Sequence, residues 1–118
     1  MVNNDQLASL RRDYISAPLS KKSVDENPMT QFRQWLKDAI ESEVADAHAM
    51  SLATATKEGK PSSRILLLKE IDDDGLIFYT NYDSKKADQI MENPFGAMLF
   101  FWPELNRQVR IEGTLEKI

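Results

Sequence analysis

The stretch Ser63-Arg64-Ile65-Leu66-Leu67-Leu68-Lys69 is an apolar segment with a cation near each end, and it predicts a β-strand around which the fold is organised. A strand whose middle is continuously aliphatic is normally covered on both faces, so we expect this one to lie within a core. Successive side chains of a strand point to opposite faces, which places Arg64 and Lys69 on different sides of the sheet. The two cations are therefore expected to serve different sites.

The segments on either side of this strand predict a series of hairpins. Four further strands are expected at residues 50–56, 76–80, 96–102 and 107–113. Turn-forming residues separate them, including the acidic Asp72-Asp73-Asp74-Gly75, which we interpret as a solvated turn rather than a calcium loop. Five closely spaced strands without long helical crossovers predict a mainly β fold, a small antiparallel barrel with peripheral helices.

Three helices are expected around this barrel. The clearest starts at Asn27-Pro28 and runs to about Val44, because proline suits the first helical position and apolar residues recur at helical spacing. These residues are Phe32, Trp35, Leu36, Ala39 and Ile40. A second helix is expected at 85–92 with Ser84 as its cap, and a short one at 4–14. We expect residues 1–26 to form an arm and linker, and residues 27–118 to form one domain.

Composition excludes several classes of function. A chain of 118 residues with a net charge of −4 and a pI near 5.0 lacks the basic character of a nucleic-acid-binding domain. It contains no cysteine and one histidine, which removes disulfides, thiolate sites and most metal chemistry. We find neither a secretory signal nor an apolar run long enough to span a membrane. We therefore expect a soluble cytoplasmic protein without a metal.

Two groups of cations could meet an anionic ligand. Lys85 and Lys86 open a predicted helix, where free N–H groups and ammonium groups together make an anion site, although they could equally be solvated surface lysines. The cluster Arg11-Arg12-Asp13-Tyr14 lies on the N-terminal arm, where it could fold over an anionic ligand or stay in water. His48 lies beside small residues and is interpreted as structural.

Five motifs, taken in order along the chain, resemble those of the pyridoxamine 5'-phosphate oxidase family. They are Arg64-Ile65-Leu66-Leu67-Leu68-Lys69, Phe78-Tyr79-Thr80-Asn81, Ser84-Lys85-Lys86-Ala87, Asn93-Pro94 and Arg107-Gln108-Val109-Arg110-Ile111-Glu112-Gly113. The similarity extends to the Arg11-Arg12-Asp13-Tyr14 arm and to Phe32-Arg33-Gln34-Trp35-Leu36, and so covers nearly the whole chain. The order of the motifs makes the resemblance specific.

The resemblance implies an FMN-binding split β-barrel, incomplete at its C-terminus, that works as a homodimer with the flavin at the subunit interface. The implied reaction belongs to vitamin B6 metabolism and oxidises pyridoxamine or pyridoxine 5'-phosphate to pyridoxal 5'-phosphate. Hydride would pass from the substrate C4' carbon to the flavin, and O2 would reoxidise the flavin. Because the flavin carries the redox chemistry, the protein supplies orientation and charge, and no catalytic side chain is assigned.

The resemblance also assigns binding residues. Those expected to bind FMN are Arg64, Ile65, Leu66, Leu67, Leu68, Lys69, Tyr79, Thr80, Lys85, Lys86 and Gln108. Within this set Arg64, Lys85 and Lys86 are expected at the FMN phosphate, whereas Lys69 would also reach the substrate phosphate. Those expected to close over the substrate as a lid are Arg11, Arg12, Asp13 and Tyr14.

The chain departs from the family pattern in two ways. Lys85 stands where the family usually has arginine, which keeps the charge but gives up bidentate phosphate geometry. Family members also continue past Ile118, through a helix that supplies groups for the substrate phosphate and a further C-terminal region. Two hypotheses follow: an FMN-dependent oxidase, or a non-catalytic flavin-binding or dimerisation module with the same fold.

Overall fold

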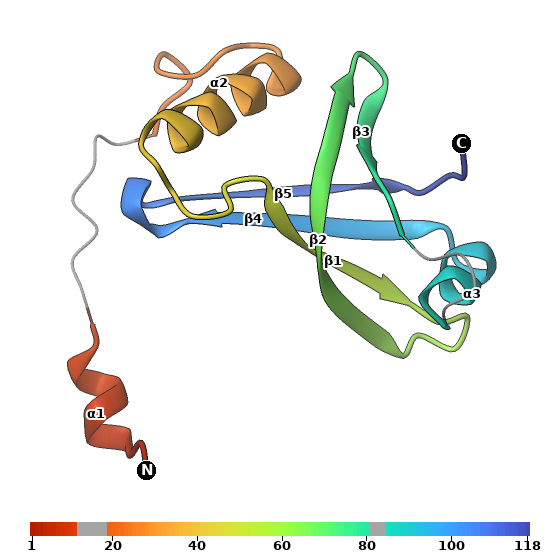
Figure 1. The fold of residues 1–118 in the computed structure, drawn as a ribbon, viewed down its shortest axis with the longest axis horizontal. Coiled ribbons are helices and arrows are strands. Elements are labelled where there is room, and N and C mark those ends of the chain that lie inside the picture. Colours follow the sequence, from red (N-terminus) through yellow and green to blue (C-terminus); the bar gives the residue numbers. More distant parts are fainter. Residues whose placement is uncertain (12–18, 81–84) are drawn as a thin grey trace.

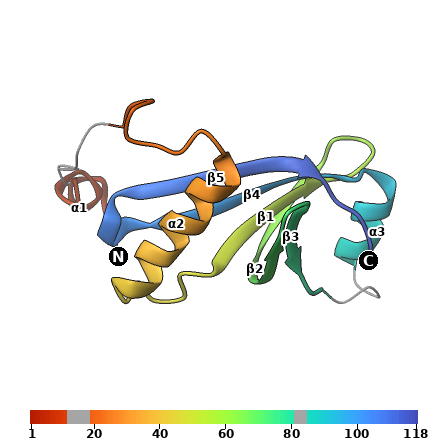
Figure 2. The same cartoon turned by 90° about the horizontal axis from the view of Figure 1, so that it is seen from above.

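Five antiparallel strands form one curved sheet in the order β3-β2-β1-β4-β5 (Figure 1). The structure is a computed structural model that describes residues 1–11, 19–80 and 85–118. The strands are β1 (Ala49–Ala55), β2 (Pro61–Asp72), β3 (Gly75–Phe78), β4 (Phe95–Trp102) and β5 (Arg107–Thr114). Seen from above, the sheet curls into a half-barrel that stays open between β3 and the end of β5 (Figure 2). The mainly β fold predicted from the sequence is confirmed.

Helix α2 (Pro28–Glu41) supplies the apolar layer over one end of the sheet. Asn27 caps it by accepting hydrogen bonds from the backbone N–H groups of residues 29 and 30, and proline occupies the first turn as predicted. Phe32 is buried and packs its ring against Phe100 and Trp102 of β4, with centroids 5.0 and 6.3 Å apart. This aromatic cluster is the centre of the core.

Two residues that the helical spacing placed on the buried face of α2 lie elsewhere. Ile40 is 58% exposed, and Trp35 is only partly buried. The Arg107 guanidinium lies over the Trp35 ring, 4.8 Å from its centroid, and forms an ion pair of 3.0 Å with Asp38. The hydrogen bond from Arg107, followed by one from Gln34, holds the pKa of Asp38 below its usual range. These contacts tie α2 to the start of β5.

Strand β2 differs from the expectation that both its faces are covered. Its side chains alternate as predicted, with Arg64 half-buried on the inner face and Lys69 exposed. However, Ile65 is 67% exposed and Leu67 is 39% exposed. The aliphatic run is therefore covered on one face only, because no layer formed by residues 1–11, 19–80 or 85–118 lies over the outer face of β2.

The remaining elements follow the predicted pattern with shifted ends. Helix α3 (Lys85–Glu92) has the expected bounds, and the 3₁₀ helix η1 (Pro103–Leu105) joins β4 to β5. Helix α1 (Asn4–Ser9) is shorter than the predicted 4–14 and buries no residue. Asp72 closes the acidic turn before β3 by accepting hydrogen bonds from the N–H groups of Asp74 and Gly75. Among the described residues no helix is both long and apolar enough to cross a membrane.

Candidate functional site: an anion-binding end of the half-barrel

Arg64 is held against strand β1 by two hydrogen bonds from one nitrogen of its guanidinium group. Its Nη1 donates to the Leu52 carbonyl and to Thr54 Oγ1, both at 2.9 Å. Leu52 is the register partner of Arg64, whereas Thr54 lies two residues further along β1. The side chain therefore leans along the sheet toward the C-terminal end of β1.

The charge of Arg64 has no carboxylate partner among the described residues. None of the ion pairs found between residues 1–11, 19–80 and 85–118 involves it. Burial disfavours the charged form and lowers the pKa of the guanidinium, but an arginine stays protonated at neutral pH. A partly buried cation without a counterion is a site at which an anion is stabilised.

Helix α3 lies beside the end of β1 toward which Arg64 leans (Figure 1). Asn93, just after the helix, reinforces this placement by donating from Nδ2 to the Thr56 carbonyl at 3.4 Å. The backbone of Lys85 and Lys86 forms the first turn of α3, while their side chains fall outside the described part of the chain. The predicted phosphate-binding residues thus come from elements that meet at one end of the half-barrel.

Thr80 contributes an unsatisfied polar atom near α3. Its Oγ1 is buried and has no hydrogen-bond partner among the described residues. Thr80 lines a cavity of about 340 Å³ together with Phe78 and with Ala87 and Ile90 of α3. A buried hydroxyl without a partner is costly, so a ligand oxygen at this position would relieve that cost. The donor set near α3 therefore fits a phosphate-bearing ligand such as FMN.

Several other predicted FMN residues lie on the outer face of the sheet. Gln108 is exposed and pairs across the ladder with Phe101 of β4. Lys69 is exposed at a register irregularity between Leu68 and Glu70, and such bulges re-aim side chains near functional sites. Tyr79 is 67% exposed just after β3. This outer set can contact a ligand that lies flat against the sheet.

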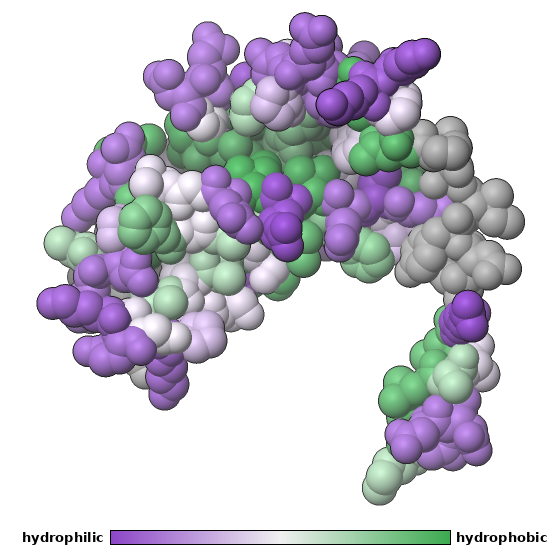
Figure 3. Space-filling view, turned by 180° about the vertical axis from the view of Figure 1, so that it is seen from behind, coloured by the Kyte–Doolittle hydropathy of each residue, from purple (hydrophilic) through white to green (hydrophobic). Residues whose placement is uncertain are grey.

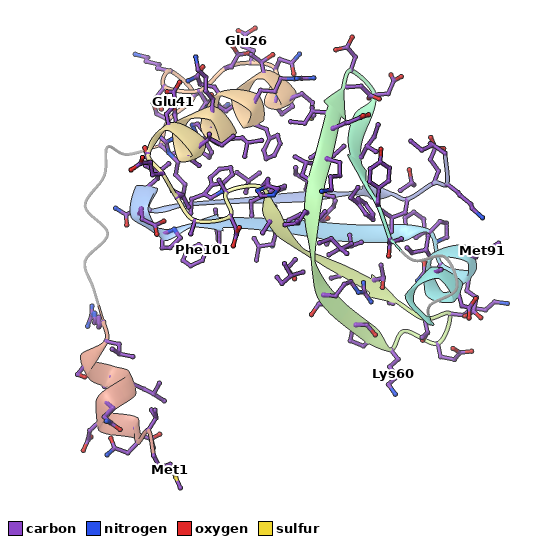
Figure 4. The ribbon with its side chains drawn as sticks, in the orientation of Figure 1. Met1, Glu26, Glu41, Lys60, Met91 and Phe101 are labelled. Atoms are coloured by element: carbon purple, nitrogen blue, oxygen red, sulfur yellow. The ribbon has the colours of Figure 1, made fainter. Side chains whose placement is uncertain are left out.

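The outer face also carries four exposed apolar side chains, which we call the outer apolar face: Ile65 and Leu67 of β2 with Leu99 and Phe101 of β4. Ser51 of β1 pairs with both Ile65 and Leu99, so these side chains stand in one row across the sheet. Phe101 points away from α2 (Figure 4) and is 56% exposed. Exposed apolar surface of this extent marks an interaction site.

The inner side of the half-barrel is incompletely covered as well. Apolar side chains lie in a hollow bordered by hydrophilic ones (Figure 3). Leu76, Phe78 and Leu115 pack on the core but stay partly exposed, and they line the cavity between β3, α3 and residues 114–118. The apolar core therefore reaches the surface between β3 and residues 114–118, a region that we call the seam.

The structure divides the predicted binding residues into two groups. Arg64, Leu66 and Leu68 face inward, whereas Ile65, Leu67, Lys69 and Gln108 face outward. Side chains of both groups therefore cannot all line one flat surface. Arg11 is exposed next to α1, and Arg12, Asp13 and Tyr14 lie outside the described residues.

Thr54 is a site residue that the sequence reasoning missed. It is 4% exposed and shares the buried face of β1 with Met50 and Leu52. The alternation of MSLATAT already placed a hydroxyl among apolar inward positions. That signal could have marked Thr54 as the partner of an inward polar group on β2, but the register was needed to identify Arg64.

Comparisons with known proteins identify the family and the fold of the chain. The sequence model of one family, described as pyridoxamine 5'-phosphate oxidase, matches residues 36–118. The chain is 49% identical over 112 residues to a pyridoxine/pyridoxamine 5'-phosphate oxidase from Cyanothece sp. and 51% identical to one from Cytophaga hutchinsonii. The alignments cover 95% of this chain and 53% and 52% of those relatives. The chain thus spans about half the length of the relatives that it matches.

Two solved structures share the fold. PhzG from Burkholderia lata, determined in complex with tetrahydrophenazine-1-carboxylic acid, is 34% identical with a TM-score of 0.76, over 79% of this chain and 46% of PhzG. A pyridoxamine 5'-phosphate oxidase-related, FMN binding protein from Nostoc punctiforme is 29% identical with a TM-score of 0.62, over 70% of this chain and 45% of that one. The predicted split-barrel fold is confirmed, with five antiparallel strands forming half a barrel.

Proposed function

Because the chain belongs to the pyridoxamine 5'-phosphate oxidase family, we propose that it forms the FMN-binding part of an enzyme that oxidises pyridoxamine or pyridoxine 5'-phosphate to pyridoxal 5'-phosphate with O2 as acceptor. One observation carries the proposal beyond the family relationship. The guanidinium of Arg64 is half-buried next to the end of β1 without a carboxylate among the described residues. A phosphate is the anion that this arrangement fits best.

The residues of this chain bind and orient in the proposed reaction. Arg64 and the start of α3, with Lys85 and Lys86, hold the FMN phosphate, and Thr80 Oγ1 supplies a further hydrogen bond. Tyr79, next to Thr80, contacts the flavin, and Lys69 meets the substrate phosphate. Gln108 lies on the outer face and would contact the flavin bound to the second copy in a homodimer. The flavin would supply the redox chemistry, which is hydride acceptance from the substrate and reoxidation by dioxygen. Arg11, Arg12, Asp13 and Tyr14 close over the substrate and exclude water.

The proposal includes a homodimer that forms through the outer apolar face. Ile65, Leu67, Leu99 and Phe101 expose apolar surface that a second copy would bury. Lys69 and Gln108 lie on the same face, so a ligand bound there would lie at the subunit interface. A cytoplasmic location remains a prediction.

A non-catalytic flavin-binding or dimerisation module is the second candidate. It is favoured by one observation, namely that the chain spans about half the length of its relatives. Residues that complete a substrate site in those relatives can lie in the half that this chain does not match.

Titration of the 118-residue chain with FMN, followed by an assay of hydrogen peroxide release from pyridoxamine 5'-phosphate, separates these candidates. We expect FMN binding to quench flavin fluorescence, and turnover to follow if the oxidase assignment is right. A flavin-loaded chain without turnover would favour the non-catalytic module. A chain that binds no FMN would contradict both.

A further inference from the structure

Among the residues that the structure describes, the Arg64 guanidinium has no ion-pair partner, and two hydrogen bonds fix its orientation. Nη1 carries two N–H groups, and the bonds to the Leu52 carbonyl and Thr54 Oγ1 use both. Two bonds from one nitrogen to two different acceptors restrict rotation of the planar group. The opposite edge, formed by Nε and Nη2, makes no hydrogen bond to any residue that the structure describes. This edge is the one that binds two oxygens of a phosphate side by side.

Thr54 provides the second of the two anchors of the guanidinium. The register places Thr54 two residues beyond the partner of Arg64, toward the end of β1 beside α3. The Leu52 carbonyl is a backbone group and stays in place whatever side chain residue 52 carries. Thr54 is therefore the side chain whose identity decides whether the guanidinium is anchored at one point or at two.

Burial makes the anchor effective. Thr54 is 4% exposed, and the core residues Met50 and Leu52 on the same face of β1 are 1% exposed. Water competes poorly for a hydrogen bond in such surroundings. An arginine held in advance loses less conformational entropy when it binds an anion than a free one does.

We propose that Thr54 is a positioning residue, which holds the Arg64 guanidinium so that its Nε–Nη2 edge meets the phosphate of the flavin cofactor. The inference rests on the proposed function and adds to it a residue that acts through Arg64. It predicts that the effect of Thr54 is confined to the phosphate, because the Thr54 hydroxyl acts on the cofactor through the guanidinium that binds the phosphate.

The test compares FMN with riboflavin, which carries the same ring system without the phosphate. Thr54→Val removes the acceptor and keeps the shape of the side chain. We expect this change to raise the FMN Kd about tenfold, which is equivalent to about 1.4 kcal/mol, and to leave the riboflavin Kd unchanged. Thr54→Ser should restore FMN binding because it restores the hydroxyl. Fluorescence quenching measures each of these dissociation constants.

Thr56→Val is the matched control. Thr56 Oγ1 also accepts a hydrogen bond, from the Lys60 N–H at 3.0 Å, but it does not contact Arg64. We expect the control to bind FMN as the wild type does, even if thermal unfolding shows that both valine variants are less stable.

Three results would overturn the inference: an unchanged FMN Kd for Thr54→Val, an equal loss of FMN and riboflavin affinity, or no rescue by serine. Failure of the proposed function looks different, because the wild-type chain itself would then bind no FMN. In that case the proposed role of Thr54 in phosphate binding is rejected together with the proposed function.

Discussion

Arg64 and Lys69 lie five positions apart on β2 and face opposite sides of the sheet. Arg64 is half-buried and anchored on β1, whereas Lys69 is exposed at a bulge. Arginine offers a planar fork for two phosphate oxygens, and lysine offers a mobile point charge. The residue types therefore suit a fixed cofactor phosphate on the inner side and an exchanging substrate on the outer side.

The first prediction separates these two cations. We expect Arg64→Ala to raise the FMN Kd at least about tenfold, since each charge-assisted hydrogen bond contributes roughly 1.5–3 kcal/mol. Lys69→Ala should mainly raise the KM for pyridoxamine 5'-phosphate and leave the FMN Kd close to that of the wild type. Fluorescence titration and steady-state kinetics provide the two constants. Equal effects of both variants on FMN affinity would show that the assignment by face is wrong.

At the scale of the element, side chains along β4 alternate between the core, where they stabilise the fold, and the outer apolar face, where they are available for association. Phe100 is fully buried in the aromatic cluster with Phe32 and Trp102, whereas Phe101 is 56% exposed on the outer apolar face. Two neighbouring residues thus have different roles, one in the core and one on the surface, because side chains next to each other in a strand point to opposite faces.

We expect Phe100→Ala to lower the free energy of unfolding by about 3–5 kcal/mol, the usual cost of emptying a buried aromatic site. Phe101→Ala should change the stability of the monomer by no more than about 0.5 kcal/mol. Urea denaturation at a low protein concentration measures both values. A large loss for Phe101→Ala under these conditions would mean that its ring belongs to the core of the single chain.

At the scale of the whole molecule, the half-barrel leaves two apolar surfaces uncovered. One is the outer apolar face, and the other is the seam between β3 and residues 114–118. A stable interface buries about 800 Å² per partner, so a single side chain is a small part of it. A charge at its centre is nevertheless costly, because that charge would be buried without a partner.

We therefore expect Phe101→Glu to shift the chain from dimer to monomer in sedimentation equilibrium while its circular dichroism spectrum stays unchanged. Ile40→Glu is the control, since Ile40 is similarly exposed, at 58%, but lies on α2. The dimer proposal fails if the wild type is monomeric, or if Ile40→Glu dissociates it as readily as Phe101→Glu does.

The sequence alone determined the local features of this protein. The bounds of α3, the start of α2 at Pro28, the turn at Asp72 and the opposite facing of Arg64 and Lys69 all follow from short-range rules of helix initiation, turn formation and strand alternation. The five-strand pattern and the family motifs also followed from the order of residues along the chain.

Only the tertiary structure determined which residues cover each face of the sheet and which groups bind its polar side chains. An aliphatic run predicts burial, but whether Ile65 is covered depends on layers that other parts of the polypeptide or another subunit supply. With the described part of the chain around it, Ile65 is 67% exposed. Likewise, strand alternation turns Arg64 inward, but its acceptors on β1 are set by the register between two strands. Registers and layers join residues far apart in the chain, and short-range rules carry no information about such contacts.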